Sequence, residues 1–418
     1  MKVSETSDPA EIAEAGLPLR QWIMLATIGL FTVLMLAVGT ELTARMLYPV
    51  SMVGFEKCFA SDDLSGDAPV RPNGVCVERV AESGIPVEYR FNSRGNRAGI
   101  ELKPKQPGVY RIVMIGSSMA MGLFVPQQMS FAALLPAELS QRTGRNVELY
   151  NEATGGKFRG GPFPTRSSAL RFKEALSADP DMVLWVITPT DVENAALEMP
   201  PRLSEAARSN LERPPGPTNA WERLRDARTR LESKLRDRWD QTRTSIVLKH
   251  FLLENESEDQ YVNSYLENED DSGFLTTKLG ARWQHAFEIL RNHAEDFARQ
   301  ANSAHVSFVA VLIPNRAQAA MISRGKWPHG YDPYNLGNML RTAIESYGGT
   351  YIDILPELRP IPNPEQHYFP VDGHLDADGH AMVSKLLVEK LVNSELLGLG
   401  PAASQSQSQS QAGLARAR

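Results

Sequence analysis

Cysteine is scarce in this chain, because its 418 residues contain only Cys58 and Cys76. So few thiols exclude a cysteine-rich zinc framework. The sequence has no Gly-Lys-Ser/Thr ending to a glycine-rich turn, and its glycines after residue 115 lack the spacing of a dinucleotide fingerprint, which excludes both common nucleotide motifs. Charge of one sign is also missing: 44 Lys and Arg stand against 50 Asp and Glu, a net charge of −6. This balance gives no reason to expect nucleic acid as a partner.

One long apolar run is present near the N-terminus, where residues 21–40 contain no charge. A helix of that length crosses a hydrocarbon core, and Trp22 and Tyr48 suit the two interfaces. We predict a tail over residues 1–20 and a transmembrane helix over 21–42. A cleaved signal peptide is the rival interpretation, but the run is long and no clear small-residue cleavage site follows it. A buried core helix is a third option.

The side of the membrane is poorly fixed by charge, because two basic residues lie at similar distances on each side of the span, which is a tie under the positive-inside rule. Cys58 and Cys76 both follow the span, 18 residues apart. A disulfide between them implies an oxidising compartment, whereas two unpaired thiols are the alternative. We expect a single-pass protein of the cytoplasmic membrane with its main domain outside the cytoplasm.

From residue 110 onward, short apolar strands alternate with helices, a rhythm that predicts an α/β fold with a doubly wound parallel sheet. Helices are expected on both faces of the sheet, including one that Ser130 caps and Gly144 ends. Five strands are expected, at residues 112–115, 147–151, 182–187, 306–313 and 351–354.

The remaining segments predict the domain organisation. The insertion, residues 196–276, is interpreted as a solvated helix and a polar loop, or as a lid or partner-binding arm. The C-terminal tail contains a Ser-Gln repeat, which predicts disorder. The expected units are a stalk at 43–109, the main domain at 110–396 with an insertion at 196–276, and a tail at 397–418.

The stretch Tyr-Arg-Ile-Val-Met-Ile-Gly-Ser-Ser, residues 110–118, reads as a buried strand that ends in a small-residue turn. Such a turn at the carboxyl edge of an α/β sheet offers Ser118 to a ligand, although a turn serine is more often a cap or a spacer. The loop after the fifth strand reaches the same edge and carries Asp372 and His374. Asp372 can hold one ring nitrogen of His374 while the other faces Ser118. The alternative is that His374 caps or packs at a helix start, as we expect of His380 inside the helix.

These motifs resemble the SGNH (GDSL-type) hydrolase superfamily, in particular its membrane-anchored bacterial members. The resemblance runs from about residue 90 to 396, outside the insertion, and includes residues 92–97, the Gly-Ser-Ser turn and the Asp-Gly-His loop. It implies that Ser118 is the nucleophile and that Asp372 and His374 complete a catalytic triad. Chemistry of this kind needs no metal and no organic cofactor.

The resemblance also implies an oxyanion hole made of backbone amides from Ser118 and Gly156, since residues 151–156 match the Asn-x-x-x-x-Gly spacing of the family. Two departures are visible. Ser117 stands where the family usually has Asp, and Thr190 stands where it has an Asn that donates to the oxyanion. Loss of one such donor typically costs about 10²–10³ in rate. The third donor is therefore expected from Thr190, Asn194 or Asn315, and the alternative is a slow enzyme.

The implied activity is hydrolysis of an ester, with an acylated, for example O-acetylated, envelope glycan as the expected substrate. Asn315 and Arg316 are the candidate substrate-binding residues, and the lipid membrane is contacted through residues 21–42. Transfer of the acyl group to another hydroxyl is one alternative. A non-catalytic, glycan-binding envelope scaffold of the same fold is the other.

Overall fold

The strands predicted from residue 110 onward pair in one five-stranded parallel sheet, so the predicted fold class is confirmed. The central strand is apolar throughout and buried at every position, as a strand covered on both faces must be. Across the sheet the order is β4 (Asn146–Asn151), β3 (Val109–Ile115), β5 (Met182–Ile187), β6 (Ser307–Leu312) and β7 (Thr350–Ile352).

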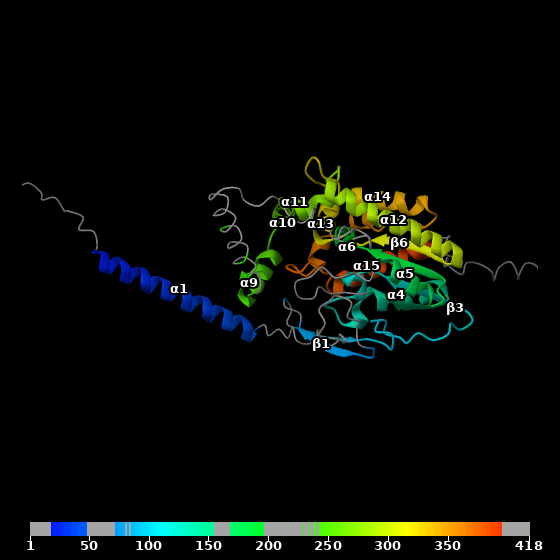
Figure 1. Ribbon diagram of the computed structural model, residues 1–418, viewed down its shortest axis with the longest axis horizontal. Helices are drawn as coiled ribbons and strands as arrows, with labels where there is room; N and C mark the ends of the chain where they lie inside the picture. Colours follow the sequence, from blue (N-terminus) through cyan, green and yellow to red (C-terminus); the bar gives the residue numbers. More distant parts are fainter. Residues whose placement is uncertain are drawn as a thin grey trace, which may run out of the picture.

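Helices cover both faces of this sheet, because the chain leaves β3 toward β4 and then reverses to add β5, β6 and β7. One layer pairs α4 (Phe131–Thr143) with α15 (Ala377–Asn393), and the other joins α5 (Ser168–Leu176), α12 (Ala281–Ala304) and α14 (Asn335–Ser346) (Figure 1). Elsewhere lie α3 (Ser118–Met121), α6 (Pro189–Ala195) and α13 (Arg316–Arg324).

The computed structural model describes residues 18–47, 72–79, 82, 85–153, 168–195, 228, 234, 238–239 and 242–394. Local signals in the sequence match these elements closely. Helix α4 begins after Ser130 and ends at Gly144, whose φ of 69° is the left-handed conformation that glycine adopts without strain. The C-terminal tail, Gly156 and residues 1–17 of the predicted N-terminal tail lie outside the described residues, whereas Leu19 and Arg20, also assigned to that tail, already belong to the first helix.

The segment assigned to a stalk contains an antiparallel hairpin, β1 (Val75–Arg79) and β2 (Pro86–Arg90). Val87 and Tyr89 of this hairpin are fully buried and belong to the main hydrophobic core. The described part of the segment is therefore packed on the body. Cys76 in β1 is buried and disulfide-bonded. Because Cys58 lies outside the described residues, the pairing of the two stays a prediction.

A single long helix, α1 (Leu19–Leu47), extends away from the body (Figure 1). It contains the predicted span and is the one helix in the described ranges that is long and apolar enough to cross a membrane, a test that a signal sequence also passes.

Part of the predicted insertion is described as well. It contains α9 (Arg243–Glu254), α10 (Glu258–Leu266), α11 (Glu269–Ser272) and a 3₁₀ turn, η2 (Gly273–Leu275).

Candidate active site

The candidate catalytic residues meet at the carboxyl edge of the sheet. Ser118 directly follows the turn after β3 and begins α3, whereas Asp372 and His374 lie in the loop between β7 and α15. The helices that follow β3 and β5 go to opposite faces, so the switch in strand order lies beside Ser118. Open α/β sheets bind ligands at such a point.

His374 stands between the other two side chains. Its Nε2 lies 2.7 Å from Ser118 Oγ, and its Nδ1 contacts the carboxylate of Asp372. The same carboxylate accepts the backbone N–H of His374 at 3.2 Å. A proton on Nδ1 satisfies the carboxylate and leaves Nε2 free to accept from the serine hydroxyl. The structure thus brings together the three residues that the sequence singles out.

An aromatic wall holds the imidazole in this position. The ring of Phe124 meets that of His374 edge to face, with centroids 5.3 Å apart, and also packs edge to face on Phe369. Phe124 has a φ of 68°, which is strained for a bulky residue. Its N–H donates to the hydroxyl of Tyr89 at 3.0 Å, so the hairpin helps to stabilise that conformation.

Arg97 fixes the loop that carries Phe124. Its buried guanidinium donates to the carbonyl oxygens of Gly122 and Val125, the latter at 2.7 Å, and lies 4.4 Å from the centre of the Tyr89 ring. Burial lowers the pKa of Arg97 to about 10, which leaves it charged at neutral pH. Sequence reasoning missed this role, because an arginine after a turn carries no signal of burial.

Glu82 supports the other side of the site. Its side chain is 6% exposed, and its two carboxylate oxygens accept the backbone N–H groups of Val371 at 2.8 Å and Asp372 at 3.0 Å. One of them also lies 3.1 Å from Nδ1 of His250 in α9. A residue before the main domain thus holds the loop that presents Asp372. No sequence motif marks it.

Replacing Glu82 by glutamine is expected to lower kcat for an ester about tenfold and to destabilise the fold by about 1–3 kcal/mol. An amide NH₂ must then face one of two N–H donors, which leaves a buried donor unsatisfied. Steady-state kinetics and urea denaturation measure the two effects. Glu88→Gln, on an exposed position of β2, is the matched control. A Glu82→Gln variant with the kinetics of the parent would remove Glu82 from the site.

The turn serine before Ser118 has a structural role. Ser117 Oγ donates to Asp191 Oδ2 at 3.1 Å, and the same oxygen accepts the N–H and hydroxyl of Thr188, each at 2.8 Å. Burial raises the pKa of Asp191, an effect that the hydrogen bonds from Thr188 and the charge of Arg171 oppose. A carboxyl group therefore lies beside the turn that carries Ser117, and it comes from α6.

Ser118 and Thr190, two of the candidate oxyanion donors, lie in the described part of the chain. The N–H of Ser118 is in the first turn of α3, where helical N–H groups have no partner within the helix. Thr190 is exposed in the first turn of α6. Asn151 ties the end of β4 to α3, since its amide donates to the Ala120 carbonyl at 2.9 Å and its oxygen accepts the Ala153 N–H at 3.0 Å.

Asn315 and Arg316 instead hold neighbouring segments together. Asn315 caps α13 and donates to the hydroxyl of Tyr265 at 2.8 Å. Arg316 is buried and donates to the carbonyl oxygens of Pro370 at 2.9 Å and Leu253 at 3.0 Å. Their substrate-binding role stays a prediction, and Arg316 joins α9 to the loop before Asp372.

His380 packs in the interior, as its position within the last helix predicts. It is buried against the ring of Phe131, and its Nδ1 accepts the Phe131 N–H at 3.3 Å. Burial lowers the pKa of His380 to about 3, so the ring is neutral at physiological pH. It is therefore not a second base for Ser118.

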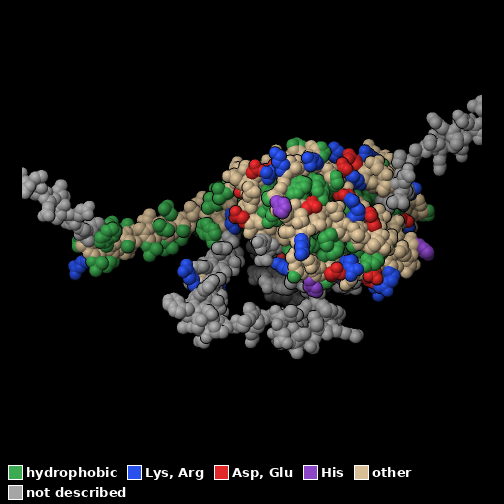
Figure 2. Space-filling model, turned by 90° about the horizontal axis from the view of Figure 1, so that it is seen from above, with side chains coloured by type: hydrophobic (Ala, Val, Ile, Leu, Met, Phe, Trp, Pro, Cys, Tyr) green, Lys and Arg blue, Asp and Glu red, His purple; other side chains and the backbone are tan. Residues whose placement is uncertain are grey.

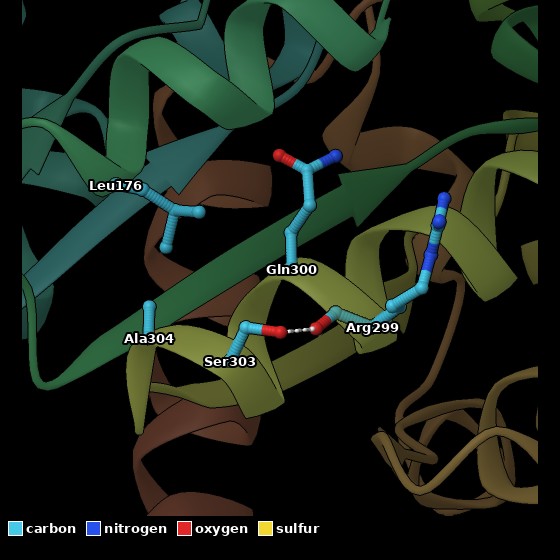
Figure 3. A pocket seen from close by; sticks show the side chains of 5 residues that line it. All are labelled: Leu176, Arg299, Gln300, Ser303 and Ala304. Atoms are coloured by element: carbon cyan, nitrogen blue, oxygen red, sulfur yellow. Dashed lines mark hydrogen bonds between the residues drawn. The ribbon is translucent and has the colours of Figure 1, made fainter.

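A surface hollow at the end of α12 is unrelated to this site. Figure 3 shows Leu176 of α5 beside Arg299, Gln300, Ser303 and Ala304. These residues lie at the ends of α5 and α12, the helices that lead into β5 and β6, so the hollow lies at the amino edge of the sheet, opposite the triad. Among the residues in view, no three His, Cys, Asp or Glu side chains are grouped as metal ligands.

No family model matches the chain, and no curated protein matches it. Similar solved structures include a lipase/acylhydrolase from Enterococcus faecalis, at 12% identity and a TM-score of 0.35 over 68% of this chain and 95% of that one. A GDSL-like lipase from Bacteroides thetaiotaomicron has 12% identity and a TM-score of 0.29 over 70% and 93%. TesA has 9% identity and a TM-score of 0.34 over 67% and 97%.

Proposed function

We propose that the chain is a membrane-anchored serine hydrolase that cleaves acyl esters. The observation that supports this most is the relay from Ser118 Oγ through both nitrogens of His374 to the carboxylate of Asp372. A serine hydroxyl is a weak nucleophile unless a base removes its proton, and an imidazole held by a carboxylate is such a base.

In the proposed reaction, Ser118 Oγ attacks the carbonyl carbon of the ester while His374 Nε2 takes the hydroxyl proton. The carbonyl oxygen becomes an oxyanion, which the N–H of Ser118 and the predicted N–H of Gly156 stabilise, with Thr190 as the third candidate. Collapse of this intermediate breaks the ester C–O bond, and His374 gives its proton to the departing alcohol. Water then attacks the acyl-enzyme while His374 takes a proton from it. The bond between Ser118 Oγ and the acyl carbon breaks, His374 returns the proton to Ser118, and the acid is released.

The proposal includes a location. The apolar helix α1 anchors the protein in the cytoplasmic membrane, and the disulfide at Cys76 favours an oxidising compartment for the body. Acyl esters of envelope glycans are substrates that such a body can reach.

A fluorophosphonate probe tests the proposal directly, because it reacts with serines that a base has activated. We expect mass spectrometry to place the adduct on Ser118 and expect Ser118→Ala protein to remain unlabelled. Ser117→Ala is the control, since its hydroxyl bonds to Asp191 and does not contact His374. A folded chain that resists the probe at Ser118 would favour the non-catalytic scaffold.

A further inference from the structure

Helix α9 is joined to the end of the apolar helix α1. The carboxylate of Glu41 in α1 accepts the N–H groups of Arg243 at 3.1 Å and Thr244 at 2.9 Å, and also the hydroxyl of Thr244 at 2.9 Å. Glu41 pairs with Arg45 at 2.7 Å. These charges follow the uncharged run of α1, so they mark the depth at which α1 leaves the hydrocarbon. The first turn of α9 lies at that same depth.

The outer side of α9 is apolar and uncovered within the described structure. Leu248, Phe251 and Leu252 are 49%, 49% and 69% exposed and recur at three- and four-residue spacing, so they share one face of the helix. The opposite side contacts the body, through His250 on Glu82 and the Leu253 carbonyl on Arg316.

The directions of the two helices fit a membrane surface. In Figure 1, α9 runs at a steep angle to α1 and lies on the side of the body from which α1 extends. Figure 2 shows that hydrophobic side chains continue along α1 up to the body. If α1 spans the bilayer, then α9, which is steeply inclined to α1 and meets it at Glu41, lies along the plane of the membrane.

We propose that α9 is an interfacial helix whose Leu248, Phe251 and Leu252 face binds the lipid bilayer. This inference rests on the membrane span of the proposed function. A helix with one apolar face settles at the boundary of headgroups and acyl chains, with its polar side away from the lipid. The polar side of α9 carries the contacts to the body, so α9 holds the body against the membrane surface.

Helix α9 is also linked to the candidate active site. His250 lies against Glu82, which holds the Val371 and Asp372 N–H groups, and Arg316 bridges the Leu253 and Pro370 carbonyl oxygens. Two separate contacts therefore join α9 to the loop before His374. Under this proposal, α9 and the side chains of Glu82 and Arg316 stand between the lipid surface and that loop.

Lipid-attached quenchers test this proposal on the full chain in nanodiscs that hold one copy each. A Leu252→Cys variant carries an environment-sensitive fluorophore, and the lipids carry nitroxides high on their acyl chains. We expect about a twofold or larger loss of fluorescence at position 252, since an interfacial helix lies at that depth. A matched label at Ser303→Cys, on the exposed end of α12, should keep its intensity.

The controls separate the possible failures. The parent chain treated with the same dye gives the background from native cysteines. A label at Leu30→Cys in α1 reports the span: if it is not quenched, the membrane anchor of the proposed function is wrong. If the α1 label is quenched and the α9 label is not, the anchor stands and the interfacial role of α9 is overturned. An unquenched α9 label overturns that role whether another segment of the chain or a second copy covers the Leu248, Phe251 and Leu252 face.

Discussion

Replacing Ser118 by alanine is expected to lower kcat/KM for a short-chain p-nitrophenyl ester by about 10³ or more, because the covalent route is lost and only binding effects remain. His374→Ala should lose a similar factor, since His374 Nε2 lies 2.7 Å from the serine oxygen. The double variant should be little worse than either single one, because the two residues act as one unit.

Rates of the three variants on one ester decide this prediction, with Ser117→Ala as the neighbour control. That variant should retain most activity, since the hydroxyl it removes bonds to Asp191. If Ser117→Ala were the inactive variant, the nucleophile would be misassigned. Equal low rates in all variants and the parent would support the scaffold alternative.

Asp372→Asn should lower kcat by a factor of about 10³–10⁴ with little change in fold. The amide cannot stabilise an imidazolium, and when its NH₂ faces Nδ1 the ring proton moves to Nε2, which then cannot accept from Ser118. Circular dichroism and kcat measured on the same preparation separate folding from chemistry.

Asp376→Asn is the matched control for this change, four residues further on. Asp376 caps α15 and accepts the Gly379 N–H at 2.8 Å, and asparagine caps a helix about equally well. Its activity should therefore match the parent. An Asp372→Asn variant as active as Asp376→Asn would show that the carboxylate does not assist His374.

The sheet could be predicted from the sequence because its strands are apolar runs between clear turn residues. Residues 182–187 were predicted to the residue, since a strand buried on both faces leaves no polar position to blur its ends. The hairpin before the sheet was missed as part of the body. Val87 and Tyr89 alternate with exposed residues over only five positions, a pattern too short to separate a packed strand from a spacer.

The candidate site also contains residues that the sequence predicts and residues that it does not. Ser118, Asp372 and His374 stand in turns at predicted strand ends, and topology brings such turns together. Glu82 and Arg97 could not be predicted, because each acts through backbone groups of distant loops. Backbone acceptors and donors leave no trace in the identity of the residues that provide them.

The order of the candidate catalytic residues along the chain has a consequence for biosynthesis. Ser118 and His374 are 256 residues apart, and the base comes second. At typical elongation rates, His374 emerges roughly 13–50 s after Ser118. Throughout that interval the new chain, with α1 already synthesised, carries a serine without a base. Under the proposed function, products of interrupted translation would therefore be inert toward esters, and hydrolysis would begin only after the last helix had been made and the body had folded.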